Sequence, residues 1–299
     1  MMGDHWQALV EPGWDLDAWR AQARKAWESK AHPVQVDWEV PEQRGLLPTP
    51  PLSEAPVRRT GLAVPPAFME LAGRVLCHRD PARHALLYQV LWRIGEGERQ
   101  VLRNALDPDI HRLMKMDKEV RRDLHKMKAF VRFRAVPGQE ETYAAWFEPE
   151  HFIVDRVAPF FVRRFAGMRF SIITPYRSAV WDGRALWLGE GGDRSMVPAE
   201  DAGEALWQTY YANIFNPARL NTRMMRQEMP QKYWHLLPET HLLPGLVRTA
   251  GERVQAMADR EAQAPRRKIP ARQRPDRTPP AAWPASGRGA AGVWCMDQF

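Results

Sequence analysis

The sequence predicts an α+β fold, with a small, mostly antiparallel sheet flanked by helices. Helical patterns lie on both sides of a run of short segments, between residues 129 and 188, that are rich in β-branched and aromatic residues. Asp182-Gly183, between two of these segments, is typical of a tight β-hairpin. No strand–helix–strand repeat, GxGxxG motif or Walker loop occurs, so nothing indicates a dinucleotide-binding or P-loop fold.

The N-terminal region predicts a short helix followed by a connector. Residues 14–30 form an amphipathic segment with tryptophans at near-helical spacing. Residues 41–66 are rich in proline, which suits an extended connector. We therefore divide the chain into an N-terminal amphipathic segment (1–40), a Pro-rich connector (41–66), an α+β domain (67–260) and a basic tail (261–299) that we expect to be disordered.

Three helices are predicted before the sheet. The first covers 67–77, and Asp80-Pro81 is a typical helix start for a second helix that reaches about residue 94. Asp107-Pro108 opens a third, which reaches about residue 128. Its expected buried stripe consists of Leu113, Met116, Val120, Leu124 and Met127.

The predicted strands are 129–134, 143–147, 169–173, 178–181 and 184–188. A helix of about 156–167 interrupts them, and further helices are predicted for 201–215 and 243–260.

Composition indicates a cytoplasmic protein that needs no cofactor. The net charge is +7, but residues 262–277 hold six basic residues and one acidic residue, so the tail supplies most of it. Two distant cysteines give neither a disulfide framework nor the spacing of a zinc or iron–sulfur site. No apolar run is long enough for a membrane span, and no signal peptide is evident. We expect no membrane association and no bound metal.

The segment 123–134 is the first candidate site. If 129–134 is a strand, Phe130, Arg132 and Arg134 share one face, which suits an anion beside a flat group, as in nucleic acid. Arg122 and Lys126, with neighbouring bases, would extend this surface along the preceding helix. The alternative is a solvated helix face whose bases pair with Asp117, Glu119 and Asp123.

Three further candidates carry chemistry. Glu148 and His151 follow a strand, and His125 would approach them if 129–134 and 143–147 pair; this set suits acid–base catalysis or one divalent metal. The alternative is a capping glutamate and a hydrogen-bonded histidine. Arg163 follows two phenylalanines and Lys232 precedes Tyr233-Trp234, so both suit phosphate contact beside stacking, or else amphipathic packing.

Several ordered blocks carry a family resemblance. They are 77–81, 85–88, 120–127, 129–133, 145–151, 158–166, 171–175, 181–183, 209–211, 214–219, 228–230 and 232–234. Together they resemble a DNA-metabolism domain of unknown function that is found fused ahead of family-X uracil-DNA glycosylases, or beside a radical-SAM protein of DNA modification or repair. The likeness covers roughly residues 14–258. Lys126, Phe170 and Gln231 depart from the residues that are usual in that family.

The resemblance implies an accessory module that binds DNA or a repair partner and works with a uracil-DNA glycosylase-type or radical-SAM enzyme. The glycosylase motifs themselves, including the water-activating loop and the cluster cysteines, are absent from this sequence, so uracil chemistry is not assigned to it. Two alternatives remain open: an enzyme that acts on nucleic acid or a nucleotide through the His/Glu centre, and a protein-interaction scaffold.

Overall fold

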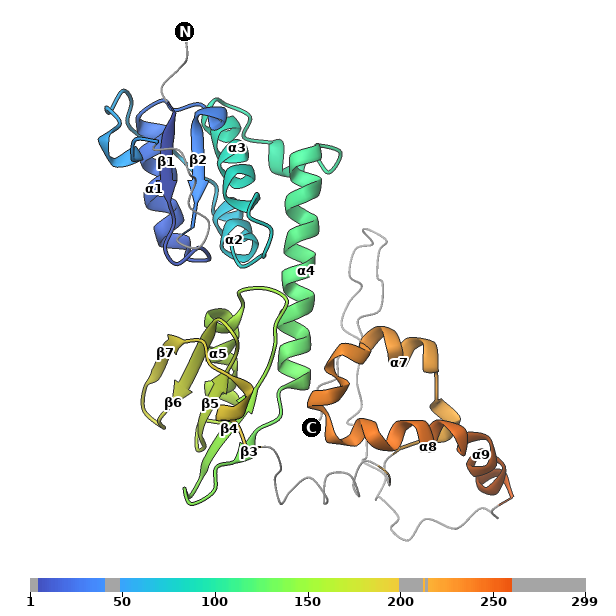
Figure 1. Ribbon diagram of the computed structural model, residues 1–299. Coiled ribbons are helices and arrows are strands. Elements are labelled where there is room, and N and C mark those ends of the chain that lie inside the picture. The colour runs from blue at the N-terminus through green and yellow to red at the C-terminus, as the bar shows by residue number, and fades with distance from the viewer. Residues whose placement is uncertain (1–4, 41–48, 199–211, 213–214, 260–299) are drawn as a thin grey trace, which may run out of the picture. The chain divides into compact units, whose positions relative to one another are not determined.

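The computed structural model describes residues 5–40, 49–198, 212 and 215–259. Residues Met1–Val254 form one compact unit; a second unit, Gln255–Phe299, begins within the last helix, and only its first residues are among those described. The α+β prediction is confirmed, because helices flank a five-stranded, mostly antiparallel sheet (Figure 1).

The N-terminal part of the unit contains a two-stranded parallel sheet and three helices. Strands β1 (Trp6–Leu9) and β2 (Val36–Glu39) pair in parallel, with α1 (Leu16–Glu28) between them in the chain. Helices α2 (Pro66–Val75) and α3 (Arg83–Gly95) follow. This small sheet was not predicted. It helps to enclose an aromatic core, in which Trp19 lies against Trp38 and Phe68.

Helix α4 (Pro108–Phe130) belongs to both hydrophobic cores of the unit. Its predicted buried stripe is confirmed: Leu113 and Met116 pack in the first core, and Val120 and Met127 pack in the second. Leu124 lies at the edge of the second core. One long helix therefore contributes side chains to both hydrophobic cores.

The main sheet has the order β3-β4-β5-β6-β7. The strands are β3 (Arg134–Ala135), β4 (Thr142–Trp146), β5 (Arg169–Ile173), β6 (Arg177–Trp181) and β7 (Leu186–Glu190). Only β4 and β5 pair in parallel, because α5 (Val154–Arg164) connects them. Helix α5 covers the face that carries Phe170, where Phe133 packs between the rings of Phe161 and Phe170.

The C-terminal elements are short. They comprise α7 (Thr222–Glu228), α8 (Leu243–Arg248) and α9 (Ala250–Ala258). Among the described residues, the 3₁₀ turns are η1 (Pro33–Gln35), η2 (Leu52–Glu54), η3 (Val101–Arg103), η4 (Arg194–Met196), η5 (Pro217–Arg219), η6 (Gln231–Leu236) and η7 (Pro238–Leu242). No helix in the described ranges is both long and apolar enough to cross a bilayer.

Two predicted elements are wrong in detail. Residues 129–134 are not a strand: α4 continues to Phe130, the Val131 N–H bonds to the Met127 carbonyl, and only Arg134–Ala135 pair with β4. The hairpin loop after β6 has four residues instead of two, because the Asp182 carboxylate accepts the N–H groups of Arg184 and Ala185 and holds a wider turn.

Other predictions meet the limits of the described residues. The helix expected at 201–215 lies almost entirely outside the described residues, and the tail expected at 261–299 lies wholly outside them. In the expected connector, 41–48 are also outside, whereas Leu52 and Ala55 are buried in the first core. The later part of the connector is therefore packed against the unit.

Candidate functional site

The outer face of α4 is a basic stripe. Its members are spaced three or four residues apart and all are exposed: His111, Lys115, Lys118, Arg122 and His125. At 1.5 Å per residue the stripe extends over about 21 Å. Within the described part of the chain, no carboxylate lies at ion-pair distance from Lys115, Lys118 or Arg122.

The acidic residues of α4 have turned away from this stripe. Asp117 is buried and pairs with Arg74 and, at 2.8 Å, with Arg121 on the flank of the helix. Glu119 lies 2.9 Å from His78. Asp123 is buried and accepts the His151 backbone N–H. The sequence left open whether these three acids neutralise the bases beside them, and the structure shows that only Arg121 is paired in this way.

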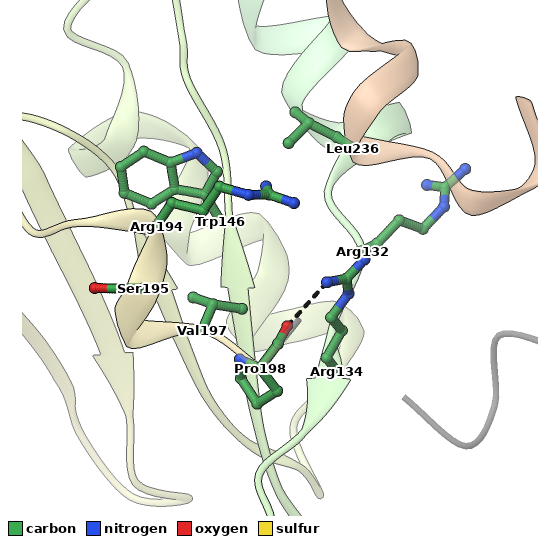
Figure 2. A pocket seen from close by; sticks show the side chains of 8 residues that line it. All are labelled: Arg132, Arg134, Trp146, Arg194, Ser195, Val197, Pro198 and Leu236. Carbon is green, nitrogen blue, oxygen red and sulfur yellow. Dashed lines mark hydrogen bonds between the residues drawn. The ribbon is translucent and has the colours of Figure 1, made fainter. Parts of the chain in front are cut away.

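An arginine-lined cavity of about 490 Å³ lies beyond the C-terminal end of α4 (Figure 2). Its lining is Arg132, Arg134, Trp146, Arg194, Ser195, Val197, Pro198 and Leu236. Three guanidinium groups therefore meet an apolar wall that contains an indole, and among the described residues no carboxylate is part of the lining. This combination suits an anion attached to an apolar or aromatic group.

Hydrogen bonds set the directions of two of these arginines. Arg132 Nη1 donates to the Ala129 carbonyl at 2.8 Å, and Arg134 Nη1 donates to the Pro198 carbonyl at 2.9 Å (Figure 2). Trp146 Nε1 donates to the Glu148 carboxylate at 2.9 Å, which fixes the indole. Arg194, which is exposed in η4, completes the set.

A second polar cluster forms around His151, where His78 and Glu119 join it. Ligand-type atoms of the three side chains lie within 4.8 Å of one another. The two imidazole rings are 4.3 Å apart at an angle of 31°. Burial, and next the neighbouring His78, lower the pKa of His151 to about 4, so His151 is neutral at pH 7.

The hydrogen bonds of this cluster use both imidazole lone pairs. His78 Nδ1 accepts the Asp80 N–H at 3.0 Å, so in the neutral ring Nε2 carries the proton and donates to Glu119. His151 Nδ1 accepts the Arg79 N–H at 3.3 Å. A metal-bound histidine instead donates its second N–H to an acceptor. The residues do not fit a preformed metal centre, and both histidines act as hydrogen-bond acceptors for the 77–80 turn.

Asp123 is the most perturbed acid in this region. Burial raises its pKa to about 6, although the His151 N–H and two nearby lysines work in the opposite direction. Its other oxygen accepts the Tyr233 hydroxyl at 3.4 Å, and desolvation raises the pKa of that tyrosine. The cluster thus connects the turn before α3, helix α4, the loop after β4 and η6.

The predicted catalytic set does not assemble. His125 is exposed on the basic stripe, and Glu148 is exposed beside Trp146. Only His151 belongs to the buried cluster, where His78 and Glu119 take the places expected for the other two. A strand over all of 129–134 was expected to bring His125 close, but α4 continues to Phe130 and only Arg134 of this range pairs with β4.

The predicted nucleic-acid contacts fall into three places. Arg122 lies on the stripe, and Arg132 and Arg134 lie in the cavity. Lys126 and Lys232 lie beside the Tyr233 ring, at 5.7 and 4.8 Å, and desolvation lowers the pKa of both. Lys232 also pairs with Glu150.

Arg163 stands apart from these contacts. It is exposed in the last turn of α5, on the helix-covered side of the sheet.

Sequence reasoning missed Arg194 and the pairing of His78 with Glu119. Arg194 follows a glycine run and carries no local signal. Cys77, next to His78 in the sequence, is buried, and burial raises the pKa of its thiol to about 11.

One family comparison finds a match. The profile of a family described as a domain of unknown function, DUF4130, matches residues 81–239, which is more than half of the chain. No curated protein and no solved structure matches the chain. The matched range begins just before α3 and includes α4, the main sheet and η6.

Proposed function

The chain belongs to the DUF4130 family of domains of unknown function, and we propose that it is a nucleic-acid-binding module of DNA metabolism. The observation that carries the proposal is the separation of charge on α4. Lys115, Lys118 and Arg122 face outward over about 10 Å, with a histidine beyond each end. Asp117, Glu119 and Asp123 instead bond toward the interior or to the flank of the helix. Such a stripe suits a row of phosphates, whose contacts are electrostatic and salt-dependent.

The arginine-lined cavity supports the same proposal. It lies beyond the C-terminal end of α4, the helix that carries the stripe, and adds a set of guanidinium groups there. A guanidinium group can donate two hydrogen bonds to one phosphate group, and the buried Trp146 adds an apolar wall beside the three arginines. The resemblance to domains fused with glycosylases, or found beside radical-SAM proteins, favours such an enzyme as the partner of this module.

A salt titration tests the proposal. We expect the full-length chain to bind a short DNA with an affinity that falls as salt rises. Lys118→Glu with Arg122→Glu should weaken binding and reduce the slope of log K against log salt by about 0.7–0.9 for each phosphate that is no longer neutralised. Arg99→Glu with Arg103→Glu is the matched control, because both of these residues are exposed and precede α4, which begins at Pro108.

The titration also separates the alternatives. Binding that ignores salt, or equal losses in the two double variants, would contradict a role for the stripe. A protein-interaction scaffold predicts no DNA binding at low salt. An enzyme built on the His/Glu centre receives less support, since His125, Glu148 and His151 do not converge and both buried imidazoles already use their lone pairs.

A further inference from the structure

We propose that the sheet face opposite α5 binds unpaired nucleotides of single-stranded nucleic acid, with a base stacked on Trp187. This inference rests on the proposed function and names the form of nucleic acid that the site takes. It starts from a single cross-strand row of the sheet. The strand registers place Arg134, Ala144, Ser171, Val180 and Trp187 opposite one another across β3 to β7.

These five side chains share one face, because residues in register across a sheet point to the same side. Phe170 neighbours Ser171 in β5, so it points to the other side, where it packs with Phe133 beneath α5. With strands about 4.8 Å apart, the row is about 19 Å long. It has a cation at one end, an indole at the other, and small or β-branched side chains between them.

The two ends of the row are accessible. At β7, Trp187 is 63 % exposed, and its neighbour Val180 is 41 % exposed. At β3, the half-buried Arg134 lines the arginine cavity, and the buried Trp146 lines it from the same sheet face. Between the ends, Ser171 is half-buried and Ala144 is buried.

The Trp187 ring is held in place. Its Nε1 donates to the Asp182 carboxylate at 3.1 Å, and the same carboxylate accepts two backbone N–H groups of the hairpin loop. Asp182, the acidic residue that contacts this indole in the described part of the chain, is therefore already used within the loop. A large, exposed and pre-oriented indole loses little conformational freedom when a base stacks on it.

Charge and shape favour a single strand as the occupant. On this face, strands β3 to β7 carry Arg134 and Arg169, and Arg194 adds a third cation at the cavity. The two carboxylates beside the face, Glu148 and Asp182, lie just beyond β4 and β6 and accept the indole N–H groups of Trp146 and Trp187. Stacking on a side chain needs a base whose flat face is free. Bases inside a duplex are already stacked on one another, whereas a single strand can lay successive bases on aromatic side chains.

Substitutions at Trp187 test the stacking. The full-length protein is titrated into a fluorescein-labelled oligothymidine and into a labelled duplex of equal length, and binding is measured by fluorescence anisotropy. Trp187→Leu keeps an apolar side chain without a π face and should weaken single-strand binding about five- to one-hundred-fold. Trp187→Phe keeps a ring and should weaken it less than about threefold. Duplex affinity should change little in either variant.

A second pair of variants tests the face itself. Val180→Glu places a carboxylate in the row and should weaken single-strand binding. Leu188→Glu is the matched control, because Leu188 is 40 % exposed on the same hairpin but points to the α5 side. Equal losses in these two variants, or equal losses for single strand and duplex in Trp187→Leu, would overturn the inference.

The outcomes also separate this inference from the proposed function. If reversal of Lys118 and Arg122 weakens DNA binding while the Trp187 variants bind like the wild type, the nucleic-acid role stands and the stacking site is wrong. If the wild type binds no nucleic acid at low salt, both fail.

Discussion

The Nδ1 atoms of His78 and His151 each accept a backbone N–H, so neither neutral ring has a free nitrogen lone pair for a metal ion. Because ligation would break these hydrogen bonds, we expect zinc or cobalt to leave the melting temperature unchanged. His78→Ala should instead destabilise the fold by about 1–3 kcal/mol, since the Asp80 N–H and Glu119 lose their partner. A metal-induced rise in melting temperature that is absent in His151→Ala would contradict this assignment.

Asp123 and His151 contribute to stability with opposite pH dependence. The folded pKa of His151 is about 4, below its usual 6.5, so the unfolded chain binds more protons and stability rises as pH increases between these values. The folded pKa of Asp123 is about 6, above its usual 3.8, so the folded chain binds more protons and stability falls as pH increases between these values. The two slopes partly cancel between pH 4 and 6.

Asp123→Asn removes the fall in stability with rising pH that Asp123 causes. The amide oxygen can still accept the His151 N–H, while the cost of charging a buried carboxylate disappears. We expect the variant to gain stability relative to the wild type as pH rises from 4 to 6, by up to about 1.4 kcal/mol for each pH unit. Urea unfolding at pH 4.5, 5.5 and 6.5 measures this difference, and parallel pH profiles would contradict it.

At the scale of elements, the start of α4 depends on Asp107. Its carboxylate accepts the N–H groups of Asp109 and Ile110 and pairs with Arg93, which lowers its pKa. Asp107→Ala should therefore cost about 1–2 kcal/mol through removal of the cap alone. Asp107→Asn keeps a capping oxygen and should cost less. The two unfolding midpoints in urea at pH 7 compare them, and equal losses would show that the Arg93 pair matters more than the cap.

The end of α4 shows where local sequence pattern fails. Met127, Phe130 and Val131 fit a helical stripe, whereas alternation over 129–134 fits a strand, and the pattern alone cannot choose between them. Tertiary contact decides: the Phe130 ring packs 5.5 Å from Tyr233, a residue more than a hundred positions away. The buried stripe of the same helix was predictable, because it repeats over several turns.

The same reasoning applies to the hairpin and to the site. The Asp182-Gly183 signal predicted a hairpin, but the side-chain bonds of Asp182 widened the loop by two residues. A shift of two keeps every side chain on its predicted face, so the face of Trp187 was predictable. The meeting of His78, Glu119 and His151 was not, because it depends on the packing of three segments that are distant in sequence.

At the scale of the whole molecule, net charge and local charge have different origins. Six basic residues and one acidic residue at 262–277 supply +5 of the net +7, whereas the stripe on α4 lies in a part of the chain that is close to neutral overall. The charge of the tail and the contacts at the proposed site can therefore be altered separately. The tail should add affinity for single strands and duplexes alike, whereas the site should discriminate between them.

Replacing the six bases of 262–277 with glutamine in the full-length chain separates the two contributions. The slope of log K against log salt should become shallower for single strand and duplex alike, because every neutralised phosphate adds to that slope. The ratio of single-strand to duplex affinity should stay the same, and Trp187→Leu in this background should still lower it. If that ratio instead falls to unity when the tail is neutralised, strand preference belongs to the tail and the sheet face has no part in it.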